Sequence, residues 1–172
     1  MGSEMCIRDS GGIGLGIIQL LVRSGCHQII AIDPQKHRTE KALSIGANIS
    51  GPDISIVSEA TDSRGCDLVI EATNSPAGMA DAVMSASIGG RVVLIGIPDG
   101  DTYTMFSAAQ ARRRGLDLRF SRRMGNVYDR AISLVEQGKV DVDTLITHRF
   151  TCLLYTSPSP RDATLSRMPS SA

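Results

Sequence analysis

Residues 9–33 decide the fold and read DSGGIGLGIIQLLVRSGCHQIIAID. After closely spaced glycines, apolar residues recur at helical spacing from Ile13 to about Arg23, and Gly25 stands where a helix ends. Residues 28–33 form a continuous apolar run ending in an acid, which is typical of a strand buried on both faces. A glycine-rich turn, a helix and a buried strand in this order predict the start of a βαβ unit. The helix residues expected near one face are Ile13, Ile17, Leu20 and Leu21.

The same alternation of helical and strand-like periods continues along the chain. Strands are expected at residues 47–50, 67–71, 91–96 and 116–120, and helices at 36–45, 53–60, 78–87, 107–113 and 128–137. Gly89 and Gly90 are expected to form a turn. Strands that alternate with crossover helices predict the α/β class, with a doubly wound parallel sheet of the Rossmann type. The residues of the 78–87 helix expected to face inward are Met79, Val83 and Met84.

The two ends of the chain differ from its middle. Residues 1–10 contain GSEMCIRDS, and residues 152–172 contain CLLYTSPSPRD and SRMPSSA, all of which resemble translated sequencing-library adapter. The tail is also rich in Ser and Pro, a composition typical of disorder. We therefore expect one domain at residues 11–151 between segments of foreign origin. On this interpretation the sheet is truncated with its first strand largely missing, since residues 4–9 offer only two inward apolar positions, and the fragment should be aggregation-prone.

The composition argues against several classes of function. The 172 residues include 18 Lys and Arg against 18 Asp and Glu, so no nucleic-acid or membrane-surface partner is indicated. No apolar stretch approaches the ~20 residues of a membrane span, and no signal-peptide core is present. The four cysteines lack C-x-x-C spacing, which indicates neither a zinc site nor a disulfide framework and fits reduced thiols in the cytoplasm. The basic run at residues 110–114 is interpreted as a solvated helix face.

The glycines before the first helix match most of a nucleotide-binding pattern, G-x-G-x-x-G. Gly11 and Gly14 take its second and third positions, while Asp9 stands at the first. The second glycine lets the backbone approach a pyrophosphate, and the third lets the helix pack closely on the sheet. The helix N-terminus supplies free N–H groups and the positive end of a dipole, both of which favour phosphate.

An acid follows these glycines at the expected offset. Asp33 ends the next strand, 22 residues beyond Gly11, where a carboxylate accepts hydrogen bonds from an adenosine ribose. It would also repel a 2′-phosphate and so favours NAD over NADP, although Lys36 and Arg38 nearby leave NADP open. The alternative interpretation takes the glycines as turn residues and Asp33 as a polar cap at the strand end.

With these features in place, the sequence resembles a known family. GGIGLGIIQLL, IIAIDPQKHR, ALSIGA and GGRVVLIGIP resemble the coenzyme-binding domain of the medium-chain zinc-dependent alcohol dehydrogenases. NVYDRAISLVEQGKVDVDTLITHRF resembles the sorbitol (L-iditol) dehydrogenases, and the resemblance covers residues 11–151. It implies hydride transfer between a polyol or secondary alcohol and NAD in a homo-oligomer. It also implies a catalytic zinc whose ligands lie in a preceding domain, so no catalytic or metal-binding residue and little activity are expected in this fragment.

The resemblance further implies which residues meet the coenzyme. Ile13 and Gly14 would border the pyrophosphate, and Asp33 and Arg38 would hold the adenosine ribose. Residues 95–97 would lie beside the nicotinamide, as would 121–123, of which Arg123 would also contact the substrate hydroxyls. The aromatic residue that follows in the polyol branch is Met124 here, a departure that weakens the polyol assignment. The complete set expected to bind coenzyme is Gly11, Ile13, Gly14, Asp33, Arg38, Ile95, Gly96, Ile97, Ser121, Arg122 and Arg123.

Three other functions remain open at this stage. A zinc-independent quinone or enoyl reductase of the same superfamily would share the coenzyme domain, but such reductases often use NADP. A non-catalytic nucleotide-binding module would require that the present chain ends are genuine. A methyltransferase also binds adenosine through a glycine-rich loop and a strand-end acid, but the spacing after Glu71 fits a dehydrogenase better. Glu71 itself is interpreted as a polar group at a strand end.

Overall fold

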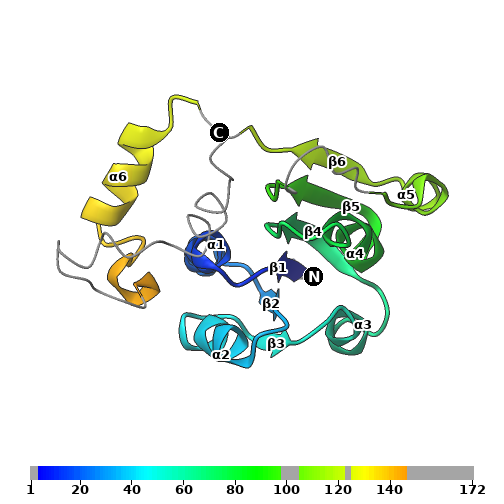
Figure 1. The fold of residues 1–172 in the computed structure, drawn as a ribbon, viewed down its shortest axis with the longest axis horizontal. Coiled ribbons are helices and arrows are strands. Elements are labelled where there is room, and N and C mark those ends of the chain that lie inside the picture. The colour runs from blue at the N-terminus through cyan, green and yellow to red at the C-terminus, as the bar shows by residue number, and fades with distance from the viewer. Residues whose placement is uncertain (1–3, 98–104, 123–124, 147–172) are drawn as a thin grey trace, which may run out of the picture.

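A computed structural model describes residues 4–97, 105–122 and 125–146 and contains one parallel sheet in the order β3-β2-β1-β4-β5-β6 (Figure 1). The strands are β1 Glu4–Arg8, β2 Gln28–Ile32, β3 Ile49–Gly51, β4 Cys66–Glu71, β5 Ala86–Leu94 and β6 Asp117–Phe120. The helices are α1 Gly12–Arg23, α2 Lys36–Ser44, α3 Ser55–Ala60, α4 Gly78–Ser85, α5 Ala108–Arg114, α6 Tyr128–Glu136 and the 3-10 helix η1 Asp143–Leu145. This confirms the predicted α/β class and doubly wound parallel sheet.

The prediction that the first strand is largely missing is wrong. Strand β1 lies at the centre of the sheet, with Cys6 opposite both Ile30 of β2 and Val69 of β4. Cys6 and Ile7 are fully buried on opposite faces of the sheet. Apolar residues of β2 and β4 surround both side chains, so two buried residues are enough to hold β1 in the sheet. The expected aggregation of the fragment rested on exposed edges beside a missing strand, and the pairing of β1 with both neighbours removes that reason.

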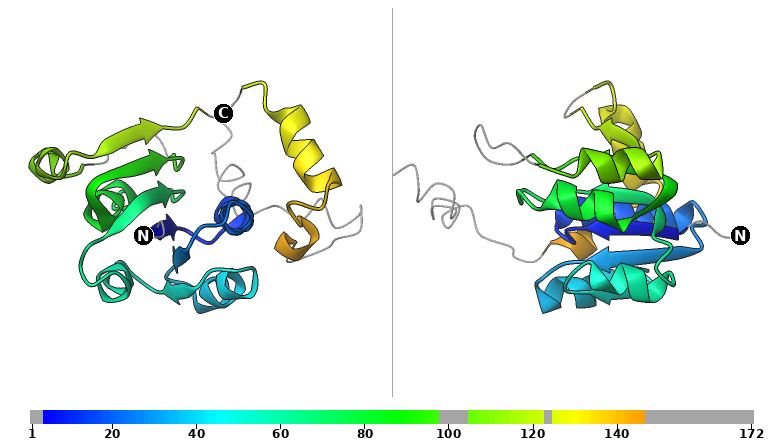
Figure 2. Two further views of the ribbon diagram at one scale, coloured as in Figure 1. Left: turned by 180° about the vertical axis from the view of Figure 1, so that it is seen from behind. Right: turned by 90° about the vertical axis from the view of Figure 1, so that its right-hand side faces the viewer.

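The sheet separates two apolar layers (Figures 1 and 2). On one face α1 and α2 bury Leu15, Ile18 and Ala42 against Ile7 and Ile29. On the other face, α3 and α4 pack against the alternate residues of the same strands, with α5 beside them. Because successive side chains of a strand point to opposite faces, the continuous apolar run of β2 serves both layers.

Several expected side-chain positions are different in the structure. Ile13 and Leu20 are exposed, because the buried face of α1 is set by Gly14, Leu15 and Ile18. Met84 is also exposed, whereas the other two inward positions expected on α4 are buried or partly buried. The glycine pair at 89–90 lies within β5, where the pairing with β4 shifts register, so the strand begins earlier than expected.

The basic run has a structural role that its composition did not show. Arg112 and Arg113 are exposed on α5, as expected. Arg114 instead donates from Nη1 to the carbonyl oxygens of Val83, Met84 and Ala86 at 3.3, 2.9 and 3.0 Å. These carbonyls end α4, and a cation there satisfies acceptors that the helix itself leaves open. Among the described helices, none has the length and apolarity needed to span a membrane.

Candidate functional site

Four strands end together at the carboxyl edge of the sheet. Arg8 of β1 lies opposite Ile32 of β2 and Glu71 of β4, and Glu71 lies opposite Leu94 of β5. The chain leaves β1 toward α1 on one face and leaves β4 toward α4 on the other. In open parallel sheets, ligands bind beyond the carboxyl ends of the strands where the direction of winding reverses in this way. The loops that follow β1, β2, β4 and β5 therefore border the candidate site.

The turn from β1 to α1 brings helix and strand into close contact. A Cβ atom at Gly14 would lie 1.9 Å from the backbone oxygen of Asp9 and 3.5 Å from Cγ2 of Ile7. Asp9 has φ +77° and donates its N–H to the Ile32 oxygen at 2.9 Å. The third glycine of the predicted pattern thus has the packing role expected of it, and the first position has the left-handed backbone that glycine adopts without strain.

The first-turn N–H groups of α1 have no side-chain cap. Gly11 is the N-cap residue of this helix. The hydroxyl oxygen of Ser10 is buried and has no hydrogen-bond partner among the described residues, although buried polar atoms are nearly always paired. Exposed Ile13 stands in the first helical turn. A phosphate at this position would meet the free N–H groups of the first turn, so the residues present fit the predicted pyrophosphate site.

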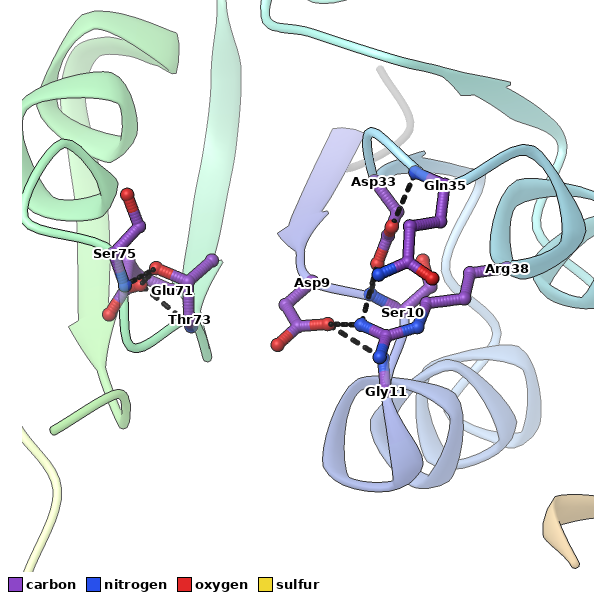
Figure 3. Close-up of polar contacts among 9 residues, drawn as sticks. All are labelled: Asp9, Ser10, Gly11, Asp33, Gln35, Arg38, Glu71, Thr73 and Ser75. Carbon is purple, nitrogen blue, oxygen red and sulfur yellow. Dashed lines mark hydrogen bonds and ion pairs between the residues drawn. The ribbon is translucent and has the colours of Figure 1, made fainter. Parts of the chain in front are cut away.

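Asp33 lies at the end of β2 with only 1% of its surface exposed (Figure 3). Its Oδ2 accepts from the Ser10 N–H at 3.0 Å, and its Oδ1 accepts from the Gln35 N–H at 2.8 Å. Arg38 Nη1 also contacts Oδ2 at 3.4 Å. The carboxylate therefore caps two turns, as the alternative interpretation proposed, and its Oδ1, which has a single donor, can still accept a further hydrogen bond.

Asp9 forms a second carboxylate beside Asp33. Its Oδ1 accepts from the Gly11 N–H at 2.9 Å and from Arg38 Nη1 at 3.0 Å (Figure 3). Partial burial raises the pKa of the Asp9 carboxyl, with a further increase from Asp33, while the Gly11 N–H and Arg38 act in the opposite direction. The Arg38 guanidinium thus forms ion pairs with both Asp9 and Asp33 at this end of the sheet.

A second polar cluster lies after β4. Glu71 is 4% exposed, and its Oε1 accepts from the backbone N–H and the hydroxyl of Thr73 at 2.7 and 2.5 Å. The Ser75 N–H donates in turn to the Thr73 hydroxyl (Figure 3). A Cβ at Gly96 would lie 1.7 Å from the backbone carbonyl oxygen of Thr73, so the loop after β5 packs directly on this turn. Glu71 is thus more than a polar strand end, since it shapes the edge where the nicotinamide is expected.

A cleft of about 250 Å³ separates the Asp9–Asp33 cluster from the turn after β4. A hollow of about 610 Å³ lies between the N-terminal turn of α1 and helix α2. The cleft is lined by Arg8, Asp9, Ile32, Asp33, Pro34, Gln35, Arg38, Pro52, Thr73, Asn74 and Ser75. The hollow is lined by Ser10, Gly11, Gly12, Leu15, His37, Arg38, Lys41, Thr144, Leu145 and Ile146. Arg38 borders both cavities, so it lies at the centre of the candidate site.

The predicted coenzyme residues fall into two groups. Gly11, Ile13, Gly14, Asp33 and Arg38 lie together at the ends of β1 and β2. The others follow neighbouring strands at the same edge: the 95–97 segment leaves β5, and the Ser121 N–H donates to the Leu94 oxygen at 2.8 Å after β6. Ile97, Ser121 and Arg122 are exposed. Arg123 and Met124 lie outside the described residues, so the predicted contact with substrate has no structural counterpart here.

The sequence analysis did not assign Ser10, Thr73 or Glu71 to the site. It noted Asp9 only as a departure from the first position of the glycine pattern and interpreted Glu71 as a polar group at a strand end. Glu71 carries the same signal as Asp33, an acid directly after a buried apolar run. No comparable signal marks Ser10, since its burial comes from tertiary packing. Within the described part of the chain, no three His, Cys, Asp or Glu residues converge as metal ligands.

Comparison with known proteins agrees with this geometry. Residues 12–137 match the pattern of the family described as zinc-binding dehydrogenase. A D-xylulose reductase of Agrobacterium fabrum is 29% identical over 151 residues, covering 85% of this chain and 43% of that protein. An L-threonine 3-dehydrogenase of Bacillus subtilis is 28% identical over 156 residues, covering 87% and 45%.

Solved structures of similar fold extend the comparison. A zinc-binding dehydrogenase of Sinorhizobium meliloti 1021 bound to NADP has a TM-score of 0.77 at 26% identity, covering 85% of this chain and 45% of that one. An alcohol dehydrogenase of Escherichia coli CFT073 in complex with NADH has a TM-score of 0.79 at 25% identity, covering 95% and 48%. The chain spans less than half the length of each of these four proteins.

Proposed function

The chain belongs to the zinc-binding dehydrogenase family, and from this membership we propose that it is the NAD-binding part of an oxidoreductase acting on a polyol or another secondary alcohol. When bound, the nicotinamide would accept hydride from the alcohol carbon. The observation that carries the proposal is the buried Asp33 carboxylate, which lies at the end of β2 beside the glycine turn and Arg38.

The residues at the ends of β1 and β2 would bind the adenosine half of the coenzyme. The ribose hydroxyls would donate to the Asp33 carboxylate, and Arg38 would flank them. The pyrophosphate would lie against Gly11, Ile13 and the N-terminus of α1, where the dipole favours negative charge. A 2′-phosphate would meet the Asp33 carboxylate at close range, and like charges in contact cost several kcal/mol, which supports NAD over NADP.

The residues at the ends of β4, β5 and β6 would receive the nicotinamide half. The 95–97 segment would lie beside the ring, with its position set by the contact between Gly96 and the Thr73 carbonyl. Ser121 and Arg122 would border the same end of the coenzyme. Arg123 would contact the substrate hydroxyls.

Zinc would act in the complete protein and not through the residues described here. These residues offer no set of three ligands, so no step of the chemistry is assigned to zinc within them. We extend the proposal to a single coenzyme-binding domain whose native sequence is residues 11–151, flanked by segments of foreign origin at 1–10 and 152–172, with residues 4–8 of the first segment completing its sheet as β1. The complete protein would be a homo-oligomer, as the family resemblance implies, and would be cytoplasmic, which the spacing of its cysteines supports.

Titration of the purified chain with NAD and with NADP by isothermal calorimetry tests the proposal. We expect the Kd for NAD to be at least about tenfold lower than that for NADP, and Asp33→Ser to remove most of this preference. Asp129→Ser serves as a control, because Asp129 is an exposed acid on α6. The far-UV circular dichroism spectrum of each variant establishes that it is folded. A folded Asp33→Ser variant that keeps the full preference for NAD would contradict the assignment.

A further inference from the structure

We propose that the Asp9 carboxylate competes with the coenzyme from within the chain, and that glycine at this position would bind NAD more tightly. The carboxylate occupies the space beside Gly11 and engages Arg38, and both are needed by the dinucleotide. This inference rests on the proposed function, because it concerns the same site. It adds a residue that sets the affinity of the site and that belongs to neither predicted group.

The Asp9 carboxylate lies directly beside Gly11. A Cβ at Gly11 would lie 3.2, 3.7 and 3.8 Å from Oδ1, Cγ and Oδ2 of Asp9. The whole carboxylate therefore lies over the open side of Gly11, and its Oδ1 takes the Gly11 N–H. The second glycine of the pattern is useful because it leaves room for a pyrophosphate to approach the backbone. In this chain an anion already fills that room.

Arg38 is already paired with two carboxylates. Its Nη1 lies 3.0 Å from Asp9 and 3.4 Å from Asp33, so the closer partner is the acid that the pattern does not call for. A guanidinium held between two carboxylates has fewer N–H groups free to donate to a ribose oxygen. Binding of the coenzyme would have to disrupt the contact between Asp9 and Arg38.

The charges that line the cleft are balanced. Its charged lining residues are Arg8, Asp9, Asp33 and Arg38, two of each sign. Arg8 is further paired with Asp81. Glycine at position 9 would leave the lining with one more positive than negative charge, which favours a ligand that carries two phosphates. Asp9 is 28% exposed at its side chain, so solvent weakens the repulsion without removing it.

The backbone at this position does not require the carboxylate. The left-handed φ of +77° suits glycine better than aspartate, and the contact of the Asp9 N–H with Ile32 involves only main-chain atoms. Asp9→Gly should therefore retain the turn.

Calorimetric titration of the full chain with NAD at fixed ionic strength tests the inference. We expect Asp9→Gly to lower the Kd by at least about tenfold, which corresponds to about 1.4 kcal/mol. Asp9→Asn retains the bulk but not the charge and should give an intermediate Kd. Asp62→Gly is the matched control, since Asp62 is exposed, has φ +49° and precedes the opposite end of β4. It should change the Kd less than twofold.

The outcomes separate this inference from the proposed function. Equal Kd values for the unchanged chain and Asp9→Gly, or weaker binding by Asp9→Gly, would overturn the competition and leave the coenzyme site intact. An equal gain from Asp62→Gly would also overturn it, because the effect would then be a general one of charge or backbone strain. Failure of all four folded proteins to bind millimolar NAD would overturn the proposed function itself.

Discussion

Replacing Gly14 with alanine should destabilise the fold strongly, because α1 packs on the backbone of the preceding turn at this residue. The new Cβ would lie 1.9 Å from the Asp9 oxygen, about 1.5 Å short of the 3.4 Å at which ordinary van der Waals contact begins. The obstacle is a main-chain carbonyl, which cannot rotate away as a side chain can. The helix would have to move, and with it Leu15 and Ile18, which are buried against the sheet. Overpacking of this kind costs typically 1–3 kcal/mol, and we expect about 3 kcal/mol here.

Urea denaturation followed by far-UV circular dichroism would measure this change, since the chain contains no Trp. The matched control is Gly16→Ala on the same helix, where a Cβ would meet no atom within 4 Å. That variant should gain about 0.5–1 kcal/mol, because alanine is the better helix former. In thermal unfolding followed by the same signal, at about 3 °C per kcal/mol, the melting temperatures of Gly14→Ala and Gly16→Ala should differ by roughly 10 °C. A Gly14→Ala variant as stable as the unchanged chain would refute the packing argument.

Three further perturbations follow from the structure. Arg114→Ala should destabilise the fold by about 1–2 kcal/mol in urea denaturation, because the carbonyls that end α4 lose their donor, whereas Arg113→Ala should change little. Glu71→Gln should cost about 1 kcal/mol and Glu71→Ala about 2–3 kcal/mol in the same assay, since the second change leaves the Thr73 donors unpaired. Hydrogen bonding to Arg64 lowers the pKa of Asp67, so the stability that the Asp67 carboxylate adds is present above its ordinary pKa of 3.8 and is lost as the pH falls below that value. The difference in urea midpoint between the unchanged chain and Asp67→Asn should therefore vanish at low pH.

Each of these expectations has a result that would contradict it. Equal losses from Arg114→Ala and Arg113→Ala would mean that charge on α5, and not the capping of α4, matters. A Glu71→Ala variant as stable as Glu71→Gln would mean that water satisfies the turn. A midpoint difference for Asp67→Asn that grows as the pH falls from 5 toward 3 would have the wrong sign for a lowered pKa.

Local patterns predicted most elements to within a few residues. The helix expected to start at Lys36 and the strand expected to start at Gln28 begin at those residues. Such boundaries depend on neighbouring residues, on the glycines that end helices and on the spacing of apolar side chains, all of which are read along the chain. The buried Asp33 beside the glycine turn was predictable for the same reason, because its offset from Gly11 is a distance in sequence.

Other features required contacts between distant segments. Strand β1 has weak apolar character by itself, and it is stabilised as the central strand because β2 and β4 pair with it on both sides. The buried face of α1 depends on Gly14 meeting the Asp9 carbonyl, which moves Ile13 and Leu20 to the surface. Neither fact follows from helical or strand periodicity.

The sequence by itself determined the class of fold, the positions of most helices and strands, and the acid after β2 on which the proposed nucleotide site depends. Only the tertiary structure decided that Asp9 reaches Arg38 and Gly11, and that Glu71 shapes the opposite side of the cleft. The physical reason is that periodicity reports which face of an element is apolar, while the partner of a polar side chain depends on which strand ends lie side by side. A parallel sheet brings those ends together from positions far apart in the chain.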